Sequence, residues 1–129
     1  MRYLSTRGQA YPVEAATAIK LGIAPDGGLF LPEEIPILSS GDLTRLADLS
    51  YAERAARIIA PYLPGYGPDE LRRYTKAAYG PDRFDDPAVT PLVRLDECTH
   101  ILELWHGPTA AFKDLALPLM PRLLTAAMA

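Results

Sequence analysis

Cysteine is almost absent from the 129-residue chain, which contains Cys98 and no other. A single cysteine cannot form an intramolecular disulfide, and this usage is typical of a reducing compartment. Long apolar runs are also missing, because no stretch approaches the roughly 20 apolar residues that a membrane-spanning helix needs. The opening residues, 1–8, lack the apolar core of a signal peptide. These absences predict a cytoplasmic protein with no membrane partner.

Positive charge is scarce as well. The formal net charge is −3 and the sequence pI is about 5.3. This balance argues against a nucleic-acid partner, whose phosphates are neutralised by clustered Lys and Arg. Lysine in particular is rare, since only three of the 13 basic residues are lysines, at Lys20, Lys76 and Lys113. Each lysine is therefore a candidate to be judged by its surroundings.

The chain does contain enough apolar sequence for a folded core. Hydrophobic residues make up 49% and charged residues 22%, a mixture typical of globular domains. The length suffices for one compact domain. We see no internal repeat and no low-complexity segment.

The first forty residues predict short elements separated by turns. A strand followed by a turn is expected in Arg2–Gly8, and a helix in the Ala-rich run Val13–Leu21, which Gly22 ends because it lacks a Cβ. Residues 25–28 predict a turn, and residues 29–31 a short strand that Pro32 terminates.

Helical signals dominate from Asp42 to Gly80. Ser50 and Glu53 have the spacing of a capping box and predict the start of a helix. Its expected apolar face comprises Ala52, Ala55, Ala56, Ile59 and Ala60. A further helix is predicted over Asp69–Tyr79, with an inner face of Leu71, Tyr74, Thr75 and Ala78.

The last third of the chain differs in character. Residues 81–87 are polar and turn-rich, which predicts a linker, and residues 90–95 and 100–105 predict a hairpin around 96–99. From Phe112 an apolar helix is expected to run to the C-terminus, kinked or broken by Pro118 and Pro121. It is apolar on most sides, which predicts burial against a larger body.

These elements predict a mixed α/β fold in two parts. Residues 1–88 form a small domain of helices and short strands, and residues 89–129 form the beginning of a second domain.

The segment most suggestive of chemistry is Trp105–Asp114, which lies between a strand and a helix, where open α/β enzymes bind ligands. Thr109 is expected to cap the following helix and Lys113 to lie in its first turn among apolar neighbours. Burial and the helix dipole would both disfavour an ammonium ion there, leaving an amine able to attack an aldehyde. Without a larger body to cover it, Lys113 is expected to be more exposed than in a complete enzyme.

Simpler interpretations exist for the same residues. Lys113 and Asp114 can be solvated surface charges, and His106 can be structural. Asp26-Gly27-Gly28 is interpreted as a turn, because it matches no phosphate-binding motif. Cys98 has no partner motif, and we assign no metal ligand.

Five segments of the chain together resemble the threonine synthase family, in order and with natural spacing: Tyr3–Gly8, Gly22–Glu33, Ser50–Glu53, Val89–Leu95 and Leu102–Asp114. The resemblance implies a fold type II enzyme dependent on pyridoxal 5′-phosphate (PLP), a carbon–oxygen lyase that converts O-phosphohomoserine and water to threonine and phosphate. It implies that Lys113 is the catalytic and cofactor-binding residue. Residues 89–129 would then be the truncated start of the PLP domain.

The chain also departs from the family. Trp105 stands where the family commonly has Phe, and Pro118 and Pro121 occupy a helix that is usually free of proline. A Gly- and Asn-rich loop for the PLP phosphate is absent, so we expect the chain alone to be inactive. Two other functions stay open: a threonine-synthase-like phospholyase for a related phosphorylated amino acid, and a non-enzymatic module that interacts through residues 115–124.

Overall fold

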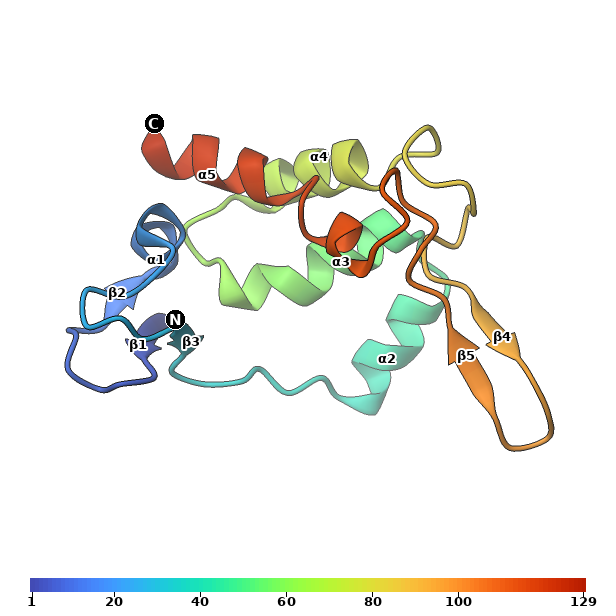
Figure 1. Ribbon diagram of the computed structural model, residues 1–129, viewed down its shortest axis with the longest axis horizontal. Helices are drawn as coiled ribbons and strands as arrows, with labels where there is room; N and C mark the ends of the chain where they lie inside the picture. The colour runs from blue at the N-terminus through green and yellow to red at the C-terminus, as the bar shows by residue number, and fades with distance from the viewer.

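The computed structural model describes residues 1–129. A three-stranded antiparallel sheet lies at one end, with the strand order β2 (Val13–Glu14), β1 (Arg2–Ser5), β3 (Phe30–Pro32) (Figure 1). The predicted first strand is confirmed. The strand predicted over 29–31 is present one residue later, as Phe30–Pro32, so Pro32 belongs to it. The helix predicted over 13–21 is two residues shorter, because Val13 and Glu14 pair with Tyr3 and Arg2 instead.

Helix α1 (Ala15–Leu21) follows β2 and ends at Gly22, whose φ of 69° lies in the left-handed region predicted for it. The 25–28 turn is also confirmed, and it is built around Asp26. The Asp26 carboxylate accepts hydrogen bonds from the Ser5 hydroxyl at 2.6 Å and from the backbone nitrogens of Gln9, Ala10 and Gly28. The Ser5 and Gly28 hydrogen bonds, in that order, lower the Asp26 pKa. Asp26 therefore fastens the sheet and is structural.

Three helices form the middle of the chain: α2 (Ser40–Ala47), α3 (Tyr51–Ile59) and α4 (Pro68–Ala78), with a 3₁₀ turn, η1 (Ala60–Tyr62), after α3. The predicted Ser50–Glu53 capping box is present at the start of α3. A second box between Ser39 and Asp42 starts α2 earlier than the predicted Asp42, and the Ser39 and Arg45 hydrogen bonds lower the Asp42 pKa to about 2. The apolar face predicted for α3 is confirmed, since its five residues are buried or half-buried.

The core lies where α1, α4 and the C-terminal helix α5 (Met120–Met128) meet. Its buried members are Ala15, Leu63, Tyr66, Leu71, Ala78, Leu119 and Leu123. Helix α3 packs on α4, and α5 packs on α1 (Figure 1). Residues 119–127 therefore return to the N-terminal part and complete its core. No helix has the length and apolar character needed to cross a membrane.

The helix expected from Phe112 onward is broken, and its first part is not α-helical. The chain forms a 3₁₀ turn, η2 (Phe112–Leu115), and α5 begins only at Met120. Pro118 falls between the two elements, and Pro121 occupies the first turn of α5, where its missing N–H is not needed. The predicted break is thus confirmed and removes the helix from Lys113.

Strands β4 (Leu92–Arg94) and β5 (His100–Leu102) form the predicted hairpin, although each strand is shorter than expected. Every residue of both strands is exposed, and the hairpin extends away from the helices (Figure 1). Residues 81–87 contain no helix or strand, in agreement with the prediction, but they are anchored: Phe84 is buried next to Tyr79, at 6.2 Å between ring centroids.

Candidate functional site

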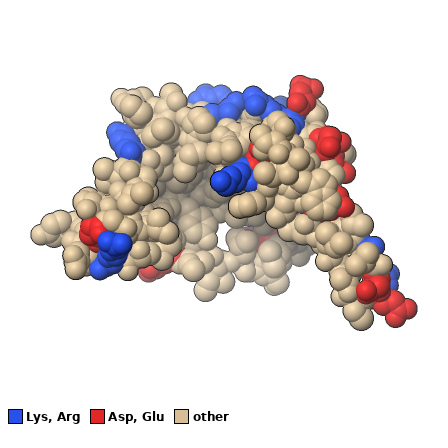
Figure 2. Space-filling view, in the orientation of Figure 1, with Lys and Arg blue, Asp and Glu red and all other residues tan.

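Lys113 lies in η2, between the hairpin and α5. Its side chain is exposed, and the adjacent Phe112 is 65% exposed. The expectation that Lys113 lies in the first turn of an α-helix is wrong for this chain, because the helix begins seven residues later at Met120. The expectation that its own chain would not enclose it is confirmed. Figure 2, in the orientation of Figure 1, shows a hollow near the centre of the molecule.

Asp114, the next residue, is 2% exposed, so it is not the solvated charge that the simpler interpretation allowed. Its carboxylate accepts hydrogen bonds of 2.8 Å from the backbone nitrogen and from Oγ1 of Thr109. Burial raises the Asp114 pKa, but these hydrogen bonds and that from the Ala111 backbone outweigh it, and the net pKa is lowered. The predicted cap is thus reversed: Thr109 donates to Asp114 and does not cap a helix with its own oxygen.

The loop between His106 and Lys113 is closely packed on Asp114. A Cβ atom at Gly107 would lie 2.6 Å from Oδ2 and 2.8 Å from Cγ of Asp114, so only glycine fits there. Ala110 has a φ of 52°, a left-handed conformation that is uncommon outside glycine. Its backbone nitrogen bonds to the Gly107 carbonyl at 3.0 Å. The turn before Lys113 is therefore defined by backbone geometry and by one buried carboxylate.

His106 begins this loop and contacts two carboxylates. Its Nδ1 lies 2.6 Å from Oδ1 of Asp85, and its Nε2 lies 2.7 Å from Oε2 of Glu103. The hydrogen bonds to Glu103 and then to Asp85 raise the His106 pKa. The backbone nitrogen of Asp85 also donates to the His106 carbonyl at 3.0 Å. The segment predicted as a linker therefore holds the start of the Lys113 loop.

Tyr79, at the end of α4, holds the other end of the loop. Its hydroxyl donates to the Leu115 carbonyl at 2.7 Å, and its ring meets Tyr51 edge to face at 5.1 Å. Burial, and secondarily Tyr51, raises the Tyr79 pKa to about 12, so the hydroxyl keeps its proton. Lys113 thus sits on a loop that is fixed at both ends.

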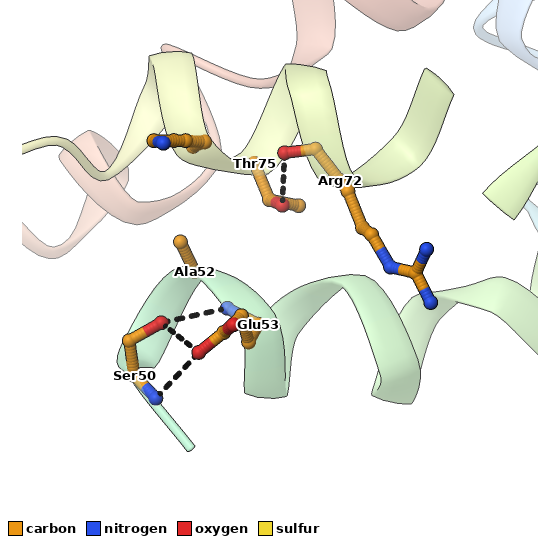
Figure 3. Close-up of a pocket in the computed structure, with 6 residues that line it drawn as sticks. Ser50, Ala52, Glu53, Arg72 and Thr75 are labelled. Atoms are coloured by element: carbon orange, nitrogen blue, oxygen red, sulfur yellow. Dashed lines mark hydrogen bonds between the residues drawn. The ribbon is translucent and has the colours of Figure 1, made fainter. Parts of the chain in front are cut away.

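A separate groove of about 310 Å³ lies between α3 and α4 (Figure 3). Its lining residues are Ser50, Ala52, Glu53, Arg72, Thr75 and Lys76. Four of its five polar side chains are already bonded: Ser50 and Glu53 cap α3, Arg72 pairs with Asp69, and Thr75 bonds to the Leu71 carbonyl. We therefore assign this groove to helix packing.

The other sequence candidates stand apart from this loop. Cys98 is exposed at the hairpin turn, where its backbone nitrogen bonds to Asp96. Lys20 lies in the last turn of α1 and Lys76 in the last turn of α4. Neither lysine has a turn like the one that precedes Lys113. The sequence did not indicate the contacts of Asp85 and Glu103 with His106, because residues 100–105 predict a strand, in which positions three apart point to opposite faces.

Comparison with known sequences identifies the family. Residues 2–79 match the family described as the threonine synthase N terminus. The chain is 41% identical over 125 residues to threonine synthase of Pseudomonas aeruginosa, covering 96% of this chain and 26% of that protein. It is 43% identical over 119 residues to human threonine synthase-like 2, covering 91% of this chain and 24% of that protein.

Solved structures agree with the sequence comparison. The fold superimposes on a crystal structure of PLP-bound threonine synthase from Brucella melitensis with a TM-score of 0.92 at 39% identity, covering 99% of this chain and 27% of that chain. This chain therefore spans about a quarter of the length of the relatives that it matches. Mixed helices and short strands, in the arrangement of that enzyme's N-terminal part, confirm the predicted fold class. The chain belongs to the threonine synthase family, and residues 2–79 are its N-terminal region.

Proposed function

We propose that the protein to which this chain belongs is a threonine synthase, a PLP-dependent carbon–oxygen lyase that converts O-phosphohomoserine and water to threonine and phosphate. Family membership supports the reaction, and the PLP in the Brucella relative supports the cofactor. The observation that carries the proposal is the exposed amine of Lys113 on a loop fixed by His106, Asp114 and Tyr79. A fixed amine is what an enzyme needs to hold a reactive cofactor in one orientation.

The residues present fit part of the PLP requirement. Lys113 offers an accessible primary amine, the group that reacts with the PLP aldehyde. The 129 residues contain no Gly- and Asn-rich loop that would bind the phosphate. We therefore assign Lys113 alone to the cofactor and expect the isolated 129-residue chain to be catalytically inactive.

When bound, PLP supplies the electron sink for proton removal and phosphate loss. The role of this chain is placement. Lys113 would bind the cofactor through Nζ and, once the amine of the substrate takes its place, would carry a proton. Asp114 holds the Thr109 side of the loop, and its lowered pKa keeps it an acceptor at neutral pH.

A second candidate is a phospholyase for a related phosphorylated amino acid. The chain is 43% identical to human threonine synthase-like 2 and 41% identical to the Pseudomonas threonine synthase, a difference of two percentage points. Identity in this region therefore does not separate a threonine synthase from a threonine synthase-like protein.

The non-enzymatic module is less well supported. Its interaction face was expected over residues 115–124, but Leu119 and Leu123 are buried in the core of the chain. Leu117, at 56% exposure, and Met120, at 50%, are the large apolar side chains left exposed in that segment.

The test is an assay of the complete protein reconstituted with PLP. With O-phospho-L-homoserine we expect equal amounts of phosphate and threonine, and no turnover in the Lys113→Ala variant. Lys20→Ala, which removes an exposed lysine from α1, is the matched control. Phosphate release from O-phospho-L-threonine but not from O-phospho-L-homoserine would favour the second candidate, and no release from either would reject both enzymes.

We also propose a cytoplasmic location, supported by the free and exposed thiol of Cys98, which a reducing compartment preserves.

A further inference from the structure

The contacts of His106 are unusual because both ring nitrogens face carboxylate oxygens. Asp85 approaches Nδ1 at 2.6 Å, and Glu103 approaches Nε2 at 2.7 Å. A neutral imidazole carries one N–H and one lone pair, so it can donate to only one of them. The other nitrogen would then direct its lone pair at an oxygen lone pair. Only the imidazolium satisfies both contacts with ionised carboxylates.

The surroundings favour that charged form. The His106 side chain is 15% exposed and that of Glu103 is 21% exposed, so water screens their contact weakly, whereas the Asp85 side chain is 78% exposed and its contact with His106 is screened more strongly. Neither carboxylate forms an ion pair with any lysine or arginine. Acidic side chains gather on the right of Figure 2, and the 81–87 segment contributes Asp85 to the contacts of His106. The ring of Trp105 stacks on His106 at 5.8 Å and adds no charge.

His106 also occupies a decisive place in the chain. It joins three segments: residues 81–87 through Asp85, the end of the hairpin through Glu103, and the Lys113 loop, which starts at the next residue, Gly107. Gly107 packs against Asp114, which follows Lys113. The His106 ring is therefore linked to Lys113 through the peptide bond to Gly107, the contact of Gly107 with Asp114 and the peptide bond between Asp114 and Lys113.

We propose that His106 is a positioning residue whose imidazolium binds Asp85 and Glu103 together and so sets where the Lys113 amine lies. This inference rests on the proposed PLP function of Lys113. It adds that cofactor binding depends on the protonation of His106. Because hydrogen bonds raise the His106 pKa above 6.5, the stabilisation is complete below that pH and is lost as pH rises through the folded pKa.

The contacts themselves can be tested in the 129-residue chain by NMR. His100 and His106 are its two histidines, so a His100→Asn background leaves one imidazole signal. We expect the His106 midpoint to lie above 6.5 and to fall in Glu103→Gln and in Asp85→Asn. The matched controls are Glu97→Gln and Asp82→Asn, whose carboxylates are exposed and lie outside this cluster. Equal midpoints in all five proteins would overturn the imidazolium bridge.

The positioning role is tested in the complete protein, by titrating PLP from about pH 6 to about pH 9, the range in which histidine switches charge. In the wild type we expect the affinity for PLP to fall as the pH rises. In Glu103→Gln the same fall should have its midpoint at a lower pH. Between the two midpoints the Glu103→Gln variant should bind PLP roughly tenfold more weakly, the loss of one charge-assisted hydrogen bond. His106→Gln has no imidazole to titrate, so it should bind PLP more weakly than the wild type, and its affinity should not change over this pH range.

A wild-type pH profile in His106→Gln or Glu103→Gln would overturn the positioning role while leaving PLP binding at Lys113 intact. Failure of the wild-type protein to bind PLP at Lys113 would instead reject the proposed function and the positioning role with it. The NMR titration judges the imidazolium bridge independently in either case.

Discussion

Asp114 accepts hydrogen bonds of 2.8 Å from both the backbone nitrogen and the hydroxyl of Thr109, and it does so while 2% exposed. The Thr109–Asp114 pair closes the loop that contains Lys113. The buried carboxylate and the exposed amine are neighbours in the chain but have different roles. One holds the turn, and the other is presented to solvent.

The first prediction concerns pH. The lowered Asp114 pKa means that its stabilisation is present above the ordinary value of 3.8 and is lost as pH falls through the folded pKa. Asp114→Asn should lower the midpoint of thermal unfolding at neutral pH, and the difference from wild type should shrink below pH 3.8. Asp82→Asn, an exposed carboxylate, controls for the loss of charge. A difference that stays constant down to low pH would contradict this role.

The second prediction concerns the contact of Gly107 with Asp114. Gly107→Ala places a Cβ 2.8 Å from Cγ of Asp114, so the loop must shift. Overpacking of this kind destabilises by about 1–3 kcal/mol. The measurement is urea unfolding, with faster amide exchange expected at Thr109 and Ala110. Gly65→Ala, where an added Cβ meets nothing within 4 Å, is the control, and equal stabilities of the two variants would refute the contact.

The third prediction concerns how the chain is divided. We propose a domain boundary near residue 88. Helix α5 lies after this boundary in the sequence, but it packs on the residues before the boundary and completes their core. Leu123 is 7% exposed in that core, and the Tyr66 hydroxyl donates to its carbonyl at 2.9 Å. Leu123→Ala should therefore cost about 2–5 kcal/mol of the free energy of unfolding.

Leu117→Ala is the matched control for α5 packing, because Leu117 is 56% exposed and surface substitutions change stability by about 0.5 kcal/mol or less. If Leu123→Ala costs as little as the control, residues 1–88 hold a core of their own and the return of α5 is unimportant.

Local signals in the sequence predicted local structure well. The capping box of Ser50 and Glu53 starts α3, and Gly22 ends α1, because these features depend on residues within one turn. The hairpin was predictable because two apolar runs flank the polar turn at 96–99. The pairing of Val13 and Glu14 with β1 was not, since these residues open an Ala-rich run typical of a helix and their partners Tyr3 and Arg2 lie ten and twelve positions away.

The sequence predicted which residue is the candidate site, but not the contacts that surround it. The sequence singled out Lys113, but its place in the first turn of an α-helix was wrong, because the α-helix begins only at Met120, in the segment that contains Pro118 and Pro121. The burial of Asp114 and the bridging of His106 depend on side chains brought together by the fold, with Asp85 coming from 21 residues away. Periodicity carries no information about such contacts.

The most direct test of the account is the position of PLP in the complete protein. Reduction with borohydride fixes PLP to the lysine that holds it, and peptide mass spectrometry then locates the modified residue. We expect one pyridoxyl group per chain, on Lys113, and weak labelling shared among Lys20, Lys76 and the N-terminal amine in the isolated 129-residue chain. Stoichiometric labelling of a lysine other than Lys113 in the complete protein would contradict the assignment.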